Sequence, residues 1–259
     1  MCIIAVYNQQ SKLDRATIER MVRKNPDGIG IAFNDGRRVT WAKGYTDAGD
    51  AYKIIKHARD NGAKDIIFHA RIATSGGVSA EKCHPFPLTS DIALLNKPYG
   101  TTRGAVVFHN GVFAIDIERG LSDTQTFVKN CLAPIRDDLA RGRLGGLVEM
   151  AVKGSRLAIL YPNRVDLFGD WHKGDGDGVQ YSNTGFRDWA SYSYSTANYW
   201  RGRDGKWRYV DINGEVRLWD EKTRAYRAET DDERDADLGV KAKKTTAGAY
   251  LRGEARYEK

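Results

Sequence analysis

Cys2 is the residue whose type and position offer the most chemistry. Removal of Met1, which a small second side chain permits, makes Cys2 the N-terminal residue and gives it a general base of its own, the α-amine. That amine titrates near about pH 7.7 and a thiol near about pH 8.5. The amine can therefore take the thiol proton, directly or through one water, and leave a strong nucleophile at neutral pH. A cysteine in second place is common by chance, so the hypothesis depends on the residues that accompany it.

Three short segments could complete a site around such a nucleophile. Phe68–Thr74 reads Phe-His-Ala-Arg-Ile-Ala-Thr and lies at the end of an expected strand. Phe108–Phe113 reads Phe-His-Asn-Gly-Val-Phe and also follows a strand, whereas Leu121–Gln125 reads Leu-Ser-Asp-Thr-Gln and opens a helix. Taken singly, each segment has a simpler structural explanation.

Each of the three segments can be explained by local structure alone. Arg71 could form a surface ion pair, and the Asn-Gly pair at 110–111 is common in hairpin turns. Ser-x-x-Gln at 122–125 fits a capping box, in which the helix dipole favours Asp123. The order of the segments after Cys2 favours a common functional role instead.

In this order the segments resemble the glutaminase domain of class II glutamine amidotransferases, which belong to the N-terminal nucleophile (Ntn) hydrolases. That family opens with Met-Cys and carries His-x-Arg-x-Ala-Thr, His-Asn-Gly and Ser-Asp-Thr motifs. Weaker likenesses are found at 25–30, at 84–85 and at 181–183, which read Asn-Pro-Asp-Gly-Ile-Gly, His-Pro and Tyr-Ser-Asn. The resemblance covers about residues 2–185. The chain departs from it at Ile3, where a glycine is common, and at Ile72, where many relatives have tryptophan.

The resemblance implies an α+β fold, a four-layer α/β/β/α Ntn-hydrolase sandwich with mostly antiparallel sheets. Cys2 is expected at the end of a central strand, which the apolar run that follows it permits. The expected domains are a glutamine amidotransferase domain at 2–185, an aromatic and arginine-rich β extension at 186–228, and a charged, mobile tail at 229–259.

The resemblance also implies the role of each site residue. Cys2 is the nucleophile, and the Asn110 side-chain amide with the Gly111 N–H stabilises the oxyanion. Arg71, supported by Thr74, binds the α-carboxylate of glutamine through a bidentate fork.

The carboxylate of Asp123 binds the α-ammonium group of the same substrate. No cofactor and no metal are expected. His69, Cys83, His84 and His109 lack zinc-ligand spacing, and two of the four lie within the motifs already assigned.

The implied reaction is hydrolysis of the side-chain amide of L-glutamine to glutamate and ammonia, which is transferred to an unidentified acceptor. Stand-alone copies of this kind resemble those encoded by bacteriophages, so a separate synthetase, transferase or base-modifying partner is expected. Two alternatives remain open: an amidohydrolase that acts on glutamine or another amide without transfer, and a non-catalytic Ntn-fold binding module.

The elements that must position these residues are readable from the apolar pattern. Helices are expected over Thr17–Lys24, Asp50–Asn61 and Ser122–Arg141, the last kinked by Pro134. The expected strands and hairpins are Cys2–Tyr7, Gly28–Phe33 with Arg37–Lys43, Asp65–Ala70, Gly104–His109, Arg156–Tyr161 with Arg164–Phe168, and Val179–Ser182.

Composition and charge limit the cellular setting and the kinds of partner that the chain can have. The chain has 259 residues, a net charge of +7 and three cysteines without framework spacing, which favours a reducing, cytoplasmic setting (the host cytoplasm for a phage protein). No apolar run is long enough to cross a bilayer and no secretory leader is expected. The basic balance permits nucleic-acid binding, and the aromatic and arginine-rich region could stack bases, although packing or a protein partner explains it more simply.

Overall fold

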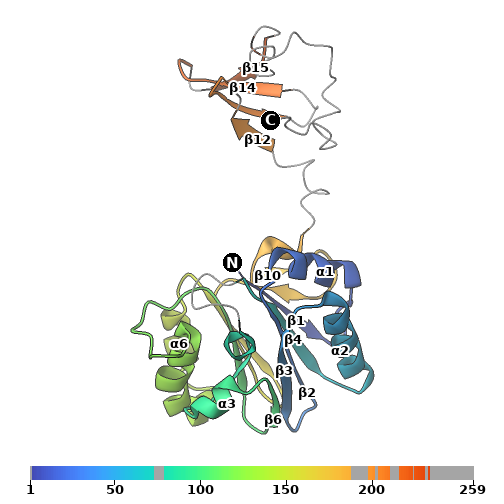
Figure 1. Cartoon of the computed structure of the whole chain (residues 1–259), viewed down its shortest axis with the longest axis vertical. Helices are drawn as coiled ribbons and strands as arrows, with labels where there is room; N and C mark the ends of the chain where they lie inside the picture. The colour runs from blue at the N-terminus through green and yellow to red at the C-terminus, as the bar shows by residue number, and fades with distance from the viewer. Residues whose placement is uncertain are drawn as a thin grey trace. The chain divides into compact units, whose positions relative to one another are not determined.

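The computed structural model describes residues 2–72, 79–187, 198–201, 204–210, 216–223, 225–230 and 233 (Figure 1). The chain divides into two compact units, Met1–Arg187 and Asp188–Lys259. None of the helices in the described ranges is long and apolar enough to cross a membrane.

The first unit contains two antiparallel sheets. The larger has seven strands in the order β10-β11-β1-β4-β2-β3-β6, and the smaller has four in the order β5-β7-β8-β9. The strands of the larger sheet are β1 (Ile3–Asn8), β2 (Ile29–Asn34), β3 (Val39–Tyr45), β4 (Asp65–Ala70), β6 (Tyr99–Thr102), β10 (His172–Lys173) and β11 (Gln180–Tyr181). Those of the smaller are β5 (Phe86–Pro87), β7 (Val106–Asn110), β8 (Arg156–Leu160) and β9 (Val165–Phe168).

The first unit contains α-helices and short turns of other helix types. The α-helices are α1 (Arg15–Lys24), α2 (Ala48–Asp60), α3 (Ile92–Asn96), α4 (Asp123–Phe127), α5 (Arg136–Ala140) and α6 (Gly145–Ala151). Short turns of other helix types are η1 (Ala80–Lys82), η2 (Val128–Leu132), η3 (Ala133–Ile135) and η4 (Thr184–Phe186).

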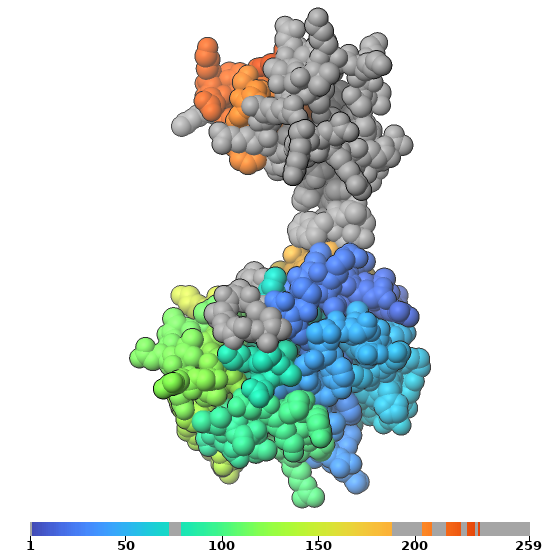
Figure 2. Space-filling model, in the orientation of Figure 1, coloured from blue at the N-terminus to red at the C-terminus, as the bar shows by residue number. Residues whose placement is uncertain are grey.

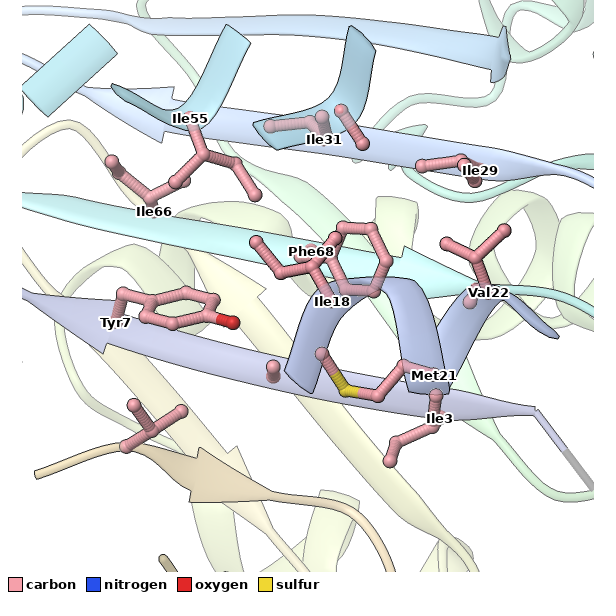
Figure 3. Close-up of a cluster of buried hydrophobic side chains, with 14 of the residues drawn as sticks. Ile3, Tyr7, Ile18, Met21, Val22, Ile29, Ile31, Ile55, Ile66 and Phe68 are labelled. Carbon is pink, nitrogen blue, oxygen red and sulfur yellow. The ribbon is translucent and has the colours of Figure 1, made fainter. Parts of the chain in front are cut away.

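Helices α1 and α2 cover one face of the larger sheet (Figure 1). Ile18 and Met21 of α1 and Ile55 of α2 share a buried cluster with Ile3 and Phe68 of the strands (Figure 3). The spacing of Ile18, Met21 and Val22 in α1 is the helical spacing that gives one apolar face. The helices expected over Thr17–Lys24 and Asp50–Asn61 are thus confirmed. Each begins two residues earlier than expected, at Arg15 and at Ala48.

The opposite face of the larger sheet packs on the smaller sheet. Ile4 and Val6 of β1 share a second buried cluster with Val106 and Phe108 of β7. Because side chains alternate along a strand, Ile3 faces the helices and Ile4 faces the second sheet. In the space-filling view, green and blue-green residues from the middle of the chain lie directly against blue N-terminal residues in the lower part of this unit (Figure 2).

The outer face of the smaller sheet carries the remaining helices. Val107 of β7 and Ile159 of β8 form a third buried cluster with Phe127, Leu132 and Val148 from the helical segments. The first unit is therefore a mixed α/β structure in which two antiparallel sheets share one apolar layer and each sheet carries helices on its outer face.

The segment expected as one kinked helix over Ser122–Arg141 is helical but is divided into four pieces. It runs through α4, the π-helical turn η2, the 3₁₀ turn η3 and α5. Pro134 in η3 has no N–H to donate and its ring excludes the preceding carbonyl, so a regular helix cannot continue through it. The interruption of the α-helix, which spans η2 and η3, is thus longer than the single kink expected at Pro134.

The second unit contains an antiparallel sheet in the order β12-β13-β14-β15. Its strands are β12 (Asn198–Arg201), β13 (Trp207–Val210), β14 (Val216–Asp220) and β15 (Ala225–Ala228). The alternating pattern over Lys206–Tyr226 predicts two short strands around Asn213-Gly214, and β13 and β14 are paired there, although residues 211–215 lie outside the described ranges. Of the expected tail at 229–259, only residues 229, 230 and 233 are described.

Candidate active site

Cys2 directly precedes β1 and is held by its neighbours on both sides of that strand. The Asn183 Nδ2 donates to the Cys2 carbonyl at 2.6 Å. The Cys2 Sγ accepts a hydrogen bond from the Ile72 N–H at 3.4 Å and donates to the Ile72 carbonyl at 3.6 Å. The side chain is half-buried, so the thiol has a defined position without being sealed from solvent.

The electrostatic surroundings act on this thiol in opposite directions. Burial raises the pKa of the Cys2 thiol, whereas the Ile72 N–H and the Arg71 charge lower it. Burial prevails, so the pKa lies above its ordinary value. A thiol in this state needs a general base in order to react at neutral pH.

Arg71 follows β4 and lies beside Cys2 because Ile3 pairs with Ala70 in the sheet. Its side chain is buried. Its backbone N–H donates to the Gly28 carbonyl at 2.8 Å, and its own carbonyl accepts from the Asp27 N–H at 3.0 Å. The turn before β2 thereby fixes the backbone that carries the guanidinium.

Gly28 is required in this turn. Its φ is +146°, a conformation that residues with a Cβ rarely adopt, and a Cβ would collide with the Cys83 Sγ. Thr74, expected to support Arg71, lies outside the described residues.

Asn110 ends β7 and connects the smaller sheet to the neighbourhood of Cys2. Its Nδ2 donates to the Ser182 Oγ at 2.8 Å, and the Ile4 N–H donates to the same oxygen at 2.8 Å. Ser182 therefore joins the Asn110 amide of the smaller sheet to β1 of the larger sheet. The contact on β1 is at Ile4, two residues after Cys2. An amide nitrogen carries two N–H groups, and this hydrogen bond uses one of them.

Gly111 lets the chain turn directly after Asn110. Its φ is +155°, and a Cβ there would collide with the side chain of Ser155 and lie 3.1 Å from the His109 Nε2. No side chain fits in this position, so the sharp turn after Asn110 requires a glycine. The backbone N–H of Gly111 directly follows the residue that carries the Asn110 amide.

Asp123 is the first residue of α4 and has a structural role. Its Oδ2 accepts from the Phe113 N–H at 2.9 Å, which ties the loop after Gly111 to the helix. Ser122 and Gln125 form the reciprocal capping box that their spacing predicts. The capping box expected from the structural explanation of this segment is therefore confirmed. The hydrogen bond from Phe113 holds the Asp123 carboxylate in a defined orientation, which is compatible with a binding role.

His109 positions the same loop, a role that the sequence motif did not assign. Its Nδ1 lies 3.1 Å from the Thr124 Oγ1 and its Nε2 lies 3.0 Å from the Ser155 Oγ. The Ser155 hydroxyl donates to the Val152 carbonyl at 2.9 Å, so it is available to His109 as an acceptor. Burial lowers the pKa of His109 to about 4, so the ring is neutral at pH 7.

Two further histidines lie between the sheets beneath Cys2 and Arg71. The rings of His69 and His84 are 4.4 Å apart, and the carbonyl of His84 packs so closely on Gly30 that no Cβ fits there. Burial lowers the pKa of His69 to about 3 and that of His84 well below its ordinary value. Both rings are uncharged at neutral pH and add no cation beside Arg71.

Lys43 is a buried residue that holds the segment carrying His84. Its Nζ donates to the carbonyls of Glu81 at 3.0 Å and Leu95 at 2.9 Å, and lies 4.3 Å from the centre of the Phe86 ring. Burial lowers its pKa to about 7. Alternation along β3 places Lys43 on the same face as Val39 and Trp41, which is the sequence signal for its burial.

Strand pairing and hydrogen bonds thus bring Cys2, Arg71 and Asn110 to the neighbouring ends of the interior strands β1, β4 and β7, and Asp123 is tied to the loop that begins at Gly111. Among the residues the structure describes, no group of three or more His, Cys, Asp or Glu side chains is placed to hold a metal ion. The arrangement offers a nucleophile, amide donors, a cation and a carboxylate.

The buried histidines predict a loss of stability in weak acid. Unfolding returns the pKa of His69, His84 and His109 to about 6.5, so the unfolded chain binds more protons between about pH 4 and 6.5. Stability is complete above about pH 6.5 and falls as the pH drops through this window. Each histidine is expected to contribute up to about 1.4 kcal/mol per pH unit to the free energy of unfolding.

Urea unfolding at pH 7.5, 6 and 5 measures this loss. His109→Gln should reduce the fall in unfolding free energy between pH 6.5 and 5, whereas His57→Gln on the exposed face of α2 should leave it unchanged. A midpoint that stays constant from pH 7.5 to 5 would contradict the neutral, buried state of these rings.

No protein-family model matches the chain, and no curated protein matches it. Among solved structures it is similar to glutamine phosphoribosylpyrophosphate (PRPP) amidotransferase from B. subtilis complexed with ADP and GMP, at 12% identity and a TM-score of 0.43. It is also similar to an allosteric regulatory enzyme of purine biosynthesis, at 15% identity and a TM-score of 0.44. Each match covers 88% of this chain but 49% and 48% of those chains, so the chain spans about half their length.

Proposed function

We propose that this chain is a glutamine amidotransferase of the Ntn type, in which Cys2 hydrolyses the side-chain amide of L-glutamine and the ammonia goes to an acceptor. The observation that carries the proposal is the hydrogen-bonded link from Asn110 through Ser182 to Ile4. It supports an amide donor at the end of β7 acting beside the start of β1, where Cys2 carries its thiol.

The reaction begins when the free α-amine of Cys2 takes the thiol proton. The Sγ then attacks the side-chain carbonyl carbon of glutamine, and the negative charge moves to the carbonyl oxygen. In our proposal the second Nδ2–H of Asn110 and the Gly111 N–H donate to this oxygen. Such donors are already oriented before the reaction, so they stabilise the developing charge without reorganisation.

The C–N bond then breaks, and the protonated α-amine gives its proton to the leaving nitrogen, which departs as ammonia. The product on the enzyme is a γ-glutamyl thioester. Water, deprotonated by the same amine, attacks the thioester carbon, releases glutamate and restores the Cys2 thiol.

The other end of the substrate is bound by charge. The planar guanidinium of Arg71 suits the α-carboxylate, with Thr74 as a supporting donor. The Asp123 carboxylate suits the α-ammonium group. The histidine that senses the Asp123 charge is His109, and its burial keeps the ring neutral at pH 7, so it adds no positive charge that would repel an ammonium group there.

The finer fold assignment belongs to the same proposal. The order of helices, sheet, sheet and helices in the first unit fits a four-layer Ntn-hydrolase sandwich at 2–185, followed by a β extension at 186–228 and a tail at 229–259. Three free cysteines fit a reducing, cytoplasmic compartment. Transfer of ammonia then requires a separate synthetase or transferase that binds the acceptor.

The proposal is tested by incubating the full-length chain with L-glutamine, L-asparagine or D-glutamine and measuring release of the free amino-acid product. L-Glutamine should be hydrolysed at least about a hundredfold faster than the others, since one methylene group or an inverted centre misplaces the amide relative to Cys2. Equal rates on all three amides, or no hydrolysis by a protein with a free Cys2 amine, would overturn it.

Asp123→Asn isolates the role of the charge. An asparagine oxygen can still accept from the Phe113 N–H, so the loop keeps its hydrogen bond while the attraction for the α-ammonium group is lost. We expect KM for L-glutamine to rise about tenfold or more with a small change in kcat. Hydrolysis of an amide substrate without the α-ammonium group should be unaffected.

The control for this variant is Asp116→Asn, which removes the same charge from an exposed position on the loop between β7 and α4. It should leave KM unchanged. An equal loss on both substrates in Asp123→Asn would assign Asp123 a structural role only.

A further inference from the structure

The side chain of Asn183 joins the turn η4 to the residue that carries the thiol. Its Oδ1 accepts from the Gly185 N–H at 2.9 Å, and its Nδ2 donates to the Cys2 carbonyl at 2.6 Å. A backbone N–H can only donate and a carbonyl can only accept, so these two partners settle which end of the amide is the oxygen and which is the nitrogen.

The Asn183 side chain replaces a backbone donor where β11 ends. The pairing of Ala5 with Tyr181 would place Thr184 opposite Cys2 if the two strands continued. The chain instead enters η4 at Thr184, and the Asn183 Nδ2 serves the Cys2 carbonyl. A side chain, which can be changed without altering the backbone, therefore holds the carbonyl of Cys2.

The turn that carries Asn183 is itself held by helix α1. The Lys24 Nζ donates to the Gly185 carbonyl at 3.1 Å, and the Arg20 Nη1 donates to the Phe186 carbonyl at 2.7 Å. Since α1 packs on the larger sheet through its apolar face, η4 has a fixed place relative to β1. The Asn183 amide is thereby anchored before it reaches Cys2.

Capping of η4 does not by itself require an asparagine at 183. An aspartate offers the same oxygen to the Gly185 N–H and is as good an N-cap residue. It has no N–H group, however, and cannot donate to the Cys2 carbonyl. The donor half of the amide serves Cys2 alone among the described residues.

The contacts of Cys2 also determine where its nitrogen lies. The Ile72 N–H holds the Sγ, and Asn183 holds the carbonyl. The Cα is a tetrahedral centre of one hand, so fixing two of its substituents fixes the direction of the nitrogen. The Cys2 N–H is among the groups that lower the pKa of the thiol, which places this nitrogen toward the Sγ. Removal of Met1 makes it the α-amine.

We propose that Asn183 is a positioning residue, which keeps the α-amine of Cys2 within reach of the Sγ by holding the Cys2 carbonyl. The inference rests on the proposed function, in which that amine is the general base. After removal of Met1 no preceding peptide bond restrains the amine, so rotation of the Cys2 backbone would carry it away from the thiol. A displacement of about 1 Å can cost about 10²-fold in rate.

Asn183→Asp tests this role because it keeps the acceptor for the Gly185 N–H and removes the donor to Cys2. We expect kcat for L-glutamine to fall about 10- to 100-fold while KM stays within about twofold. The fall should be largest near pH 7 and smaller near about pH 9.5, where the thiol can ionise without the amine. Asn183→Ala, which adds no charge beside Cys2, should show the same pattern.

Alkylation by iodoacetamide gives a second readout that does not involve glutamine. The full-length chain is treated with methionine aminopeptidase, and the adduct on each cysteine is followed by peptide mass. Both Asn183 variants should slow alkylation of Cys2 at pH 7 about tenfold or more, since the displaced amine no longer takes the thiol proton. Cys131, an exposed thiol in the same molecules, should react at an unchanged rate.

The matched control is Asn61→Asp. The Asn61 Nδ2 donates to the His57 carbonyl at 2.8 Å at the exposed end of α2, so this variant makes the same chemical change far along the chain from Cys2. It should leave kcat and the alkylation of Cys2 unchanged. Circular dichroism with thermal unfolding verifies that all variants keep their fold.

The proposal is overturned if both Asn183 variants keep their kcat and their rate of Cys2 alkylation. It is also overturned by a fall in kcat that is equal at both pH values with alkylation unchanged, which would assign Asn183 a structural role only. Slower Cys2 alkylation in a chain that does not hydrolyse glutamine would support the positioning role and reject the substrate, so the two failures are distinguishable.

Discussion

Replacing Cys2 by alanine is expected to abolish glutamine hydrolysis, by at least about 10⁴-fold in kcat, while the chain stays folded. In the proposed reaction the Sγ forms the bond to the amide carbon, and in the described part of the site we assign that role to no other group. The side chain is half-buried, and within the described residues the hydrogen bonds of its sulfur go to Ile72, so its loss is expected to change packing little. Glutamate release and the urea midpoint measure the two effects.

Cys131→Ala is the matched control because Cys131 is an exposed thiol in the helical layer of the second sheet. It should keep full activity. Cys2→Ser should remain almost inactive, since a hydroxyl is far harder to deprotonate by an amine than a thiol is. Hydrolysis by Cys2→Ala at more than a few per cent of the original rate would contradict the mechanism.

Asn110→Ala is expected to lower kcat about 10²- to 10³-fold and to change KM little. In the proposed reaction the amide donates to an oxygen that carries charge only during the reaction, so its loss should affect the transition state more than substrate binding. Steady-state kinetics with L-glutamine separates the two parameters.

Ser182→Ala distinguishes the donor from its support. This variant keeps the Asn110 amide but removes the oxygen to which Nδ2 and the Ile4 N–H donate. A smaller fall in kcat than that of Asn110→Ala is expected, and the double variant should lose no more than Asn110→Ala alone within about threefold. A rise in KM with kcat intact in Asn110→Ala would contradict the oxyanion role.

Much of the fold follows from local patterns. The hairpin of β2 and β3, the strands β4 and β8 and the helices α1 and α2 are confirmed within about two residues of their expected limits. Their apolar residues alternate or recur with a clear period, and the turn residues Asn34 to Gly36 separate the two strands of the hairpin. The long-range pairing of β1 with β4 and β11 was not predictable from such patterns.

Elements with weak local signals were missed. Helix α6 begins with Gly145-Gly146, which are poor helix formers, and it is held by burial of Val148 and Val152 against the second sheet. The short β6 lies at the edge of the larger sheet and has no buried residue. Tertiary packing, rather than propensity, forms both elements.

The site residues divide in the same way. Cys2, Arg71, Asn110 and Asp123 belong to motifs of neighbouring residues, so sequence alone could single them out. Contacts across the fold determine the supporting roles of Ser182, His109 and Lys43. A serine directly after a strand, or a lysine within one, gives no local sign that it will join two sheets or hold a distant carbonyl.

The measurement that tests the central claim most directly is the intact mass of the full-length chain after incubation with 6-diazo-5-oxo-L-norleucine, an electrophilic glutamine analogue. We predict loss of Met1 and one adduct, located on Cys2 by peptide mapping and protected by excess L-glutamine. The Cys2→Ala variant should remain unlabelled. A chain that keeps Met1 and gains no adduct, or that is labelled equally in the variant, would contradict an N-terminal cysteine nucleophile acting on glutamine.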